Sequence, residues 1–112
     1  MSQGDVWWAD LPPPGCLRAG VPSAIVFVQC NAFNRSRLRT VLCVPLTTNL
    51  TLSIAPGNVL LQSDSTGLPQ DSVANVSQIL AIDRTLLQEQ TGRVSDGQLQ
   101  LIFDGFDVVL GR

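Results

Sequence analysis

The 112-residue chain contains no histidine and no tyrosine, and because lysine is also absent, each of its seven basic side chains is an arginine. The lack of histidine excludes His-based acid–base pairs, the Ser-His-Asp arrangement and histidine-containing zinc sites. The lack of lysine excludes lysine-dependent phosphate-binding loops and Schiff-base chemistry. Any catalysis must therefore rely on arginine, carboxylates, hydroxyl groups or the three cysteines.

Paired cysteine spacing and long apolar runs are also missing. Cys16, Cys30 and Cys43 are odd in number and none of them forms a CxxC pair, so the sequence predicts neither a disulfide framework nor a metal knuckle. The N-terminus lacks the charged start and apolar run of a signal peptide, and the longest apolar run, residues 24–28, is too short to cross a bilayer. We therefore expect one cytoplasmic domain over residues 1–112, with reduced thiols and no membrane contact.

The charges are distributed unevenly along a chain whose formal net charge is −2. Between residues 11 and 63 the only charged side chains are Arg18, Arg35, Arg37 and Arg39, whereas the acids lie in the first ten residues and from residue 64 onward. One face is thus expected to be locally positive, as a phosphate-binding cleft requires. The alternative is that scattered arginines only keep an apolar surface in solution.

Short apolar segments separated by turn residues predict a mainly β fold. Strands are expected over residues 5–11, 23–29 and 38–46, with a turn over 31–37. Residues 51–62 read as a strand, a Pro-Gly turn and a second strand, and residues 72–79 as another strand. Asp83 is placed to cap a short helical turn before Gly92. Because side chains alternate along a strand, Trp7 and Trp8 are expected on opposite faces, one in the core and the other at a cleft or a partner surface.

The last segment has helical periodicity. Ser95 and Gln98 form a capping-box pattern, and apolar residues follow at helical spacing until Gly111. The fold class we predict is therefore a small, partly open barrel of the SH3-like type with one C-terminal helix covering it.

Three segments resemble one family. "VQCNAFNRSRLRTVLCVPLTTNL" (residues 28–50), "LPQDSVANVSQILAIDRTLL" (68–87) and "GDVWWADLPPPG" (4–15) are similar to the corresponding segments of the MazF/PemK family of bacterial toxins. The resemblance implies a homodimeric toxin of a type II toxin–antitoxin system, held inactive by a cognate antitoxin. It also implies an endoribonuclease that cleaves single-stranded RNA without a metal or other cofactor, leaving a 2′,3′-cyclic phosphate and a 5′-hydroxyl.

The resemblance also points to catalytic residues. The threonine of the family's "PLT" pattern corresponds to Thr47, which would donate to the scissile phosphate, although a threonine at a strand end is also an ordinary β-former. The family's catalytic arginine position is occupied by Val21, so we expect Arg18, from the preceding loop, to reach the phosphate instead. An arginine can clamp phosphate oxygens through two parallel hydrogen bonds.

Five further residues are candidate RNA contacts: Thr48, Asn31, Asn34, Arg35 and Gln78. Amides can read base edges and arginine can bind phosphate or stack on a base. The alternative for Asn31 and Asn34 is turn chemistry, and for Gln78 a main-chain contact. Arg37 and Arg39, expected on one strand face, would add electrostatic attraction or be solvated. Two other functions stay open: a silent antitoxin-binding module, because of Val21, and a gyrase inhibitor built on the same fold.

Overall fold

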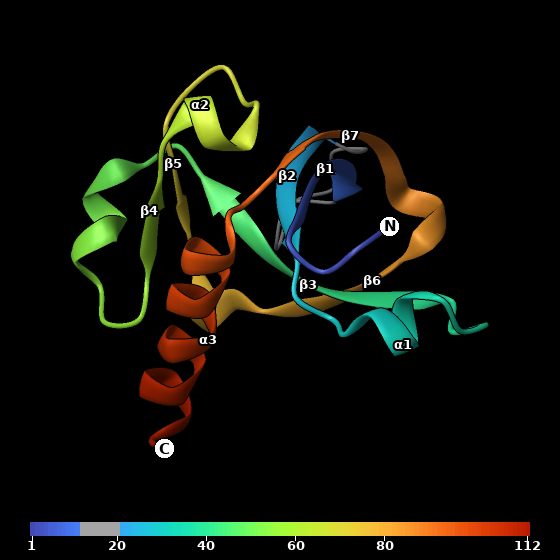
Figure 1. Ribbon diagram of the computed structural model, residues 1–112. Helices are drawn as coiled ribbons and strands as arrows, with labels where there is room; N and C mark the ends of the chain where they lie inside the picture. The colour runs from blue at the N-terminus through green and yellow to red at the C-terminus, as the bar shows by residue number, and fades with distance from the viewer. Residues whose placement is uncertain (12–20) are drawn as a thin grey trace.

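The computed structural model describes residues 1–11 and 21–112, and this part of the chain forms a curled antiparallel sheet with one long helix (Figure 1). The strands are β1 (Asp5–Leu11), β2 (Val21–Phe27), β3 (Thr40–Thr47), β4 (Val59–Leu61), β5 (Ser72–Ala74), β6 (Leu80–Asp83) and β7 (Leu87–Arg93). The helices are α1 (Asn31–Asn34), α2 (Ser63–Thr66) and α3 (Asp96–Leu110), and the 3-10 turns are η1 (Leu50–Ile54), η2 (Val76–Gln78) and η3 (Arg84–Leu86).

Strand β3 organises the sheet because it pairs along both edges. The strand order is β4-β5-β3-β2-β1-β7, and β6 also pairs with β3. The first half of β3 pairs with β6, from Thr40 opposite Asp83, and its end pairs with β5, with Thr47 opposite Val73. One edge of β3 is thus divided between two strands, and the sheet curls into the half-barrel that the sequence predicts.

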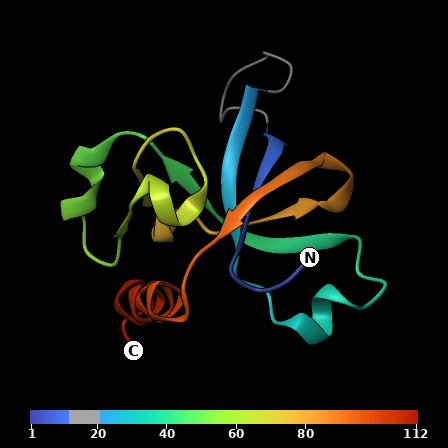
Figure 2. The ribbon, with the colours of Figure 1, turned by 45° about the horizontal axis from the view of Figure 1, so that its top comes forward.

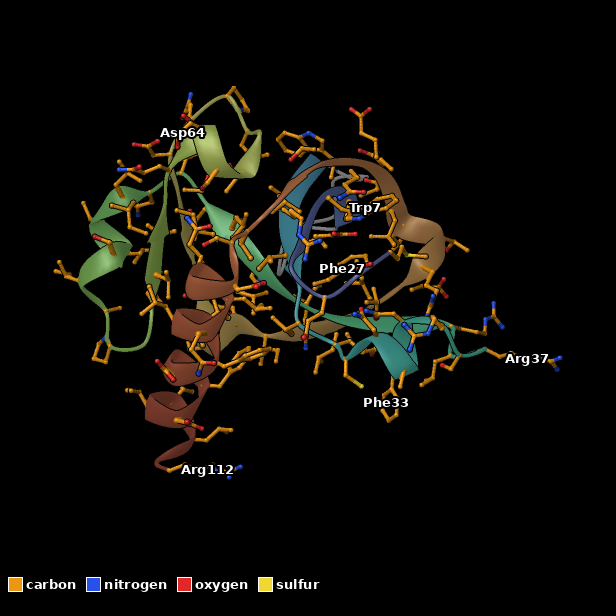
Figure 3. All side chains as sticks on the ribbon, viewed as in Figure 1. Trp7, Phe27, Phe33, Arg37, Asp64 and Arg112 are labelled. Atoms are coloured by element: carbon orange, nitrogen blue, oxygen red, sulfur yellow. The ribbon has the colours of Figure 1, made fainter. Side chains whose placement is uncertain are left out.

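Two apolar clusters lie on the two faces of the curled sheet. The first contains Val26, Val44, Leu61 and Ile102, and Trp8 packs against it. The second contains Ile25, Phe27, Val41 and Cys43, and Trp7 packs against it. Trp7 stacks on Phe27, with ring centroids 5.9 Å apart and an interplanar angle of 4° (Figure 3). The alternation predicted for the two tryptophans is therefore confirmed.

Helix α3 begins and ends at the predicted residues. The Ser95 side chain accepts from the Gln98 backbone N–H, the Gln98 side chain accepts from the Ser95 backbone N–H, and Gly111 adopts the left-handed conformation at the C-cap. The helix lies on the same side of the molecule as β4, whereas α1 lies on the other side (Figures 1 and 2). Gly105 allows its backbone to contact the turn at Gly57: a Cβ there would lie 2.1 Å from the Gly57 carbonyl oxygen.

Several predicted elements were wrong. Residues 51–54, predicted as a strand, lie in η1, because the Asn49 side chain accepts from the Thr51 N–H and starts a turn. The strand predicted over 72–79 ends at Ala74, where η2 follows. The turn predicted over 31–37 is present, and its first residues form the single helical turn α1. Strand β7 was not predicted at all: its sequence LQEQTGR is polar because much of it is exposed.

Candidate functional site

A pocket of about 430 Å³ opens beside the end of β3. Three parts of the chain that are distant in sequence meet there: β1 and β2, the end of β3, and the segment from α2 to β5. The lining residues are Trp8, Ser23, Ala24, Leu46, Thr47, Thr48, Leu68, Pro69, Gln70 and Ser72. The pocket thus combines an apolar floor with hydroxyl and amide groups, an arrangement typical of small ligand sites.

Thr47 is held at the pocket by main-chain pairing and by its own hydroxyl. It is the last residue of β3, opposite Val73 of β5, and its side chain is half-buried. Its Oγ1 accepts a hydrogen bond of 3.2 Å from the Asn49 backbone N–H. Because the hydroxyl accepts in that bond, its proton is available to be donated to a ligand oxygen. Thr48 follows in an exposed position and also lines the pocket.

The opposite wall is fixed by contacts between α2 and β7. The Leu68 backbone N–H donates to Thr66 Oγ1 at 3.2 Å, and Thr91 Oγ1 donates to the Thr66 carbonyl at 2.8 Å. The two backbones touch where both residues are glycine: a Cβ at Gly92 would lie 2.4 Å from the Thr66 carbonyl oxygen, and one at Gly67 would lie 2.2 Å from that of Thr91. Gly67 also has φ +77°, which glycine adopts readily. The wall that carries Leu68 is therefore held in place before any ligand arrives.

No side chain that lines the pocket among the described residues is ionisable. Asp10 is the nearest carboxylate along β1, two residues beyond Trp8 and therefore on the same strand face. Its Oδ1 is buried and has no hydrogen-bond partner within the described part of the chain. Arg18, the predicted catalytic arginine, and Cys16 lie outside the described residues. Val21, at the family's arginine position, pairs with Leu11 in the β1–β2 ladder.

Asn31, Asn34 and Arg35 do not line this pocket. Asn31 and Asn34 lie in α1, and Arg35 is its C-cap. This segment lies beside the first half of β3, because the backbone N–H groups of residues 28 and 29, just before α1, both donate to the Leu42 carbonyl. Thr47 lies at the other end of that strand (Figure 1). Seven residues of extended strand separate Thr40 from Thr47, a distance of about 23 Å.

The two asparagine amides are used within the turn. Asn31 Oδ1 accepts from the Gln3 backbone N–H at 2.7 Å and from Asn34 Nδ2 at 3.1 Å, and Asn34 Nδ2 also donates to the Gln29 carbonyl at 3.0 Å. These bonds correspond to the turn chemistry that the sequence left open for both residues. Gln78 ends η2 with an exposed side chain, away from the described pocket lining. RNA contacts by these residues stay a prediction.

Sequence reasoning did not single out Ser23, Gln70 and Ser72, although all three line the pocket. Ser23 lies on β2, whereas Gln70 and Ser72 come from the α2–β5 segment. Gln70 and Ser72 lie within the segment 68–87 that resembles the family, whereas Ser23 lies outside all three similar segments, and no local pattern marks a serine as pocket-lining. The signal lies in the sheet, which brings β2 and β5 to the two edges of β3.

The described residues contain neither a cluster of metal ligands nor a membrane-spanning helix. No three His, Cys, Asp or Glu side chains in this part of the chain gather closely enough to hold a metal ion. None of the helices among the described residues is long and apolar enough to cross a membrane.

The half-barrel, its C-terminal helix and the pocket beside Thr47 define a small SH3-like barrel domain with one candidate ligand site among the described residues. The sequence pattern of the PemK-like, MazF-like toxins of type II toxin–antitoxin systems matches residues 2–110, and the chain belongs to this family. Endoribonuclease MazF6 of Mycobacterium tuberculosis is 34% identical over 110 residues, covering 98% of this chain and 96% of the relative. Endoribonuclease MazF of Staphylococcus saprophyticus is 28% identical over 111 residues, covering 99% and 92%.

Solved structures have the same fold. The M. tuberculosis toxin MazF-mt6 superposes with a TM-score of 0.79 at 17% identity, covering 96% of each chain. An endoribonuclease in complex with its cognate antitoxin, from a mycobacterial species, superposes with a TM-score of 0.74 at 23% identity, covering 99% of this chain and 93% of the other. The predicted family and fold class are thereby confirmed.

Proposed function

We propose that this toxin cleaves single-stranded RNA at the pocket beside Thr47, without a metal ion. The observation that carries the proposal is the Thr47 hydroxyl, which accepts from Asn49 and keeps its proton for a ligand at the edge of a preformed pocket. The relatives in this family carry the name endoribonuclease, which supports an RNA substrate. The chain has no histidine or lysine, so the nucleophile is best supplied by the substrate itself.

In the proposed reaction the 2′-oxygen of the ribose attacks the neighbouring phosphorus. The new bond from O2′ to phosphorus closes the 2′,3′-cyclic phosphate while the bond from phosphorus to O5′ breaks. The 2′-hydroxyl loses its proton to solvent or to a nearby base, and the leaving O5′ gains one to become a hydroxyl. The protein has to orient this attack and to stabilise the charge that develops on the phosphorane oxygens. Hydrogen-bond donors held in position stabilise that charge most strongly in a site that excludes water.

Four side chains of the pocket, together with Arg18, have proposed roles in that reaction. Thr47 donates its hydroxyl proton to a non-bridging phosphate oxygen, and Arg18 supplies the positive charge that the described lining lacks. Trp8 lines the pocket while packing on the core, so its ring offers a fixed surface on which a base can stack. Thr48 and Gln70 add donors and acceptors for the ribose or the base.

The test is cleavage of a long single-stranded RNA in excess chelator, with the cut ends mapped. Discrete cuts with 5′-hydroxyl ends are expected from the wild type. Thr47→Val keeps the side-chain shape but loses the hydroxyl, and we expect kcat/KM to fall by about 10²–10³-fold, as for loss of one oxyanion donor. Thr47→Ser should retain most activity, and Thr40→Val, at an exposed threonine at the other end of β3, is the matched control.

Arg18→Ala tests the second half of the proposal. Loss of cleavage with retained binding of RNA supports its role at the phosphate, whereas unchanged cleavage refutes it. If the wild type makes no cuts at high concentration, the endoribonuclease proposal itself is wrong, and the silent antitoxin-binding alternative takes its place.

We also propose that the toxin works as a homodimer and is bound by a cognate antitoxin in the cytoplasm. Leu60, Leu101 and Val108 are between 48% and 57% exposed and flank a hollow of about 370 Å³ beside Gly57 and Gly105. So much apolar surface on one side is characteristic of an interface. Sedimentation should give a dimer for the wild type and a monomer for Leu101→Asp.

The antitoxin as a partner is supported by the solved complex of a similar endoribonuclease with its cognate antitoxin. The free thiols of Cys30 and Cys43 suit a reducing compartment such as the cytoplasm.

A further inference from the structure

Four of the seven arginines lie around α1, in the segment between α1 and β3, and at η3. We call Arg35, Arg37, Arg39 and Arg84 the arginine surface. Arg35 caps the C-terminus of α1, Arg37 and Arg39 lie in the segment before β3, and Arg84 begins η3. The strand face predicted for Arg37 and Arg39 was therefore wrong, because β3 begins only at Thr40. In Figure 3 Arg37 and Phe33 project from this part of the molecule, and Arg112 lies apart from them, just after the end of α3.

The arginine surface is built on a fixed backbone. Arg84 donates from Nη1 to the Asn34 carbonyl at 2.8 Å and from Nη2 to the Phe33 carbonyl at 3.1 Å, and its backbone N–H donates to the Arg39 carbonyl at 2.9 Å. Ser36 Oγ donates to the Phe33 carbonyl at 2.6 Å. These bonds tie α1 to η3 across the molecule, so the surface is organised before it meets a ligand.

The charge of this surface is strongly positive for a chain that is acidic overall. Its hollow, of about 310 Å³, is lined by Ser36, Arg37, Leu38, Arg39, Asp83, Arg84 and Thr85. Asp83 is the only acid in this lining, and it is already engaged: its Oδ1 accepts from the Thr85 N–H and hydroxyl, both at 2.9 Å. Those bonds, with a smaller effect of Arg39, hold the pKa of Asp83 below its usual value. The four arginines and Asp83 leave a local charge of about +3, which attracts polyanions.

The side chains around the surface favour a nucleic acid over an acidic peptide. The Phe33 ring is 55% exposed on α1, two residues before Arg35, and the Phe33 carbonyl accepts from Arg84 Nη2. Exposed aromatic rings beside guanidinium groups suit single strands, because bases stack on rings and on guanidinium planes while the arginines contact phosphates. An acidic peptide would use the charge but leave the ring without a partner.

We propose that the arginine surface binds phosphates of the RNA strand several nucleotides away from the bond that is cut beside Thr47. The two places lie at opposite ends of β3, about 23 Å apart along the strand, so one phosphate does not reach both. This inference rests on the proposed function. It adds a second RNA-binding surface that strengthens binding of long substrates and takes no part in the chemistry.

The experiment measures binding and cleavage of two RNAs that share the mapped cleavage site, one long and one trimmed to the site alone. Binding is followed by fluorescence anisotropy over a salt series in the Thr47→Val background, in which the expected loss of activity slows cleavage of the RNA during the measurement. Arg37→Gln/Arg39→Gln is the test variant, because both side chains are exposed. Arg112→Gln, just after the end of α3 and apart from the arginine surface, is the control for a lost charge.

For the long RNA, the slope of log affinity against log salt should become shallower by about 1.4 in the double variant, since each phosphate contact on a single strand contributes about 0.7. The trimmed RNA should bind equally well to both proteins, and Arg112→Gln should leave the slope unchanged. In the active background, the double variant should raise KM for the long RNA and leave kcat unchanged. Arg37→Lys/Arg39→Lys should restore most of the slope, because the contact is to charge.

Three results would overturn the inference. They are an unchanged slope, an equal loss for both RNAs, or a loss confined to binding of a polyglutamate peptide. The last of these would mark the surface as a site for acidic protein segments. Failure of the wild type to cleave either RNA would instead reject the proposed function, and the salt slopes would still report whether the arginine surface binds RNA.

Discussion

Replacing Gly92 with alanine is expected to displace the pocket wall that α2 carries. A Cβ at Gly92 would lie 2.4 Å from the Thr66 carbonyl oxygen and 2.9 Å from its carbon. Both are backbone atoms, so the overlap cannot be relieved by rotating a side chain. The backbones of α2 and β7 must separate, and Leu68, whose N–H is bonded to Thr66 Oγ1, must move with Thr66.

The magnitude follows from two losses. Overpacking a close contact costs about 1–3 kcal/mol. Separating the two backbones also breaks the bond of 2.8 Å from Thr91 Oγ1 to the Thr66 carbonyl, which contributes about 1 kcal/mol. Glycine's larger loss of backbone entropy favours alanine by about 0.5–1 kcal/mol. The net destabilisation is therefore expected to be about 1–3 kcal/mol, or a fall in Tm of roughly 4 °C per kcal/mol in a chain of this size.

The assay is urea unfolding at one protein concentration, followed by RNA cleavage at a temperature where the variant is folded. Gly97→Ala in α3 is the matched control, because its Cβ would meet only Ser95 Oγ, at 3.9 Å. That substitution should stabilise the protein by up to about 1 kcal/mol through helix propensity. We expect Gly92→Ala to lower kcat/KM as well, since the wall is displaced. A Gly92→Ala protein as stable and active as the wild type would refute this reasoning.

Two further predictions concern titration and thiol chemistry. Because the chain has no histidine, the cleavage rate should rise with pH between about 6 and 8 without the bell shape of a histidine acid–base pair. A bell-shaped profile in that range would contradict a mechanism in which the RNA supplies the nucleophile. Burial raises the pKa of Cys43 from 9.0 to about 12, so folding stability should be complete below pH 9.0 and fall as the pH approaches 12, by up to about 4 kcal/mol. Cys43→Ala should abolish this alkaline loss, and peptide mapping after alkylation should find exposed Cys30 modified and Cys43 protected until unfolding.

The sequence predicted those parts of the fold whose causes are local. The strand over residues 5–11 ends at three prolines, and the capping box and Gly111 bound the last helix, so each boundary is encoded where it occurs. Strand β7 has no such local cause. Its polar residues become a strand because β1 offers an unpaired edge, from Asp5 opposite Arg93 to Ala9 opposite Leu87. Tertiary pairing of this kind overrides propensity and leaves no local pattern to read.

Only part of the candidate site was predictable from the sequence, because some of its residues come together through strand pairing alone. Thr47 was identified because a short family pattern surrounds it, and the structure places it at the pocket. Ser23 and Ser72 reach the same pocket only through the pairing of β2 and β5 with β3. Conversely, Asn31 and Asn34 lie close to Arg35 in sequence, but the Asn31 amide accepts from the Gln3 backbone N–H and the Asn34 amide donates to the Gln29 carbonyl. The closeness of these three residues in sequence suggested an RNA-binding site. In the structure the two asparagines instead hold the segment that carries part of the arginine surface.

The separation of charge from chemistry explains how an acidic chain can act on RNA. The described lining of the pocket carries no charged side chain, while Arg37, Arg39 and Arg84 gather at the far end of β3. If long-range attraction comes from that end, added salt weakens capture of a long strand and leaves the cleavage step at Thr47 unchanged, because exposed charges are screened beyond about 10 Å in 0.1 M salt. KM should then depend on salt and kcat should not. The same dependence for a trimmed RNA would place the attraction at the pocket, and therefore with Arg18.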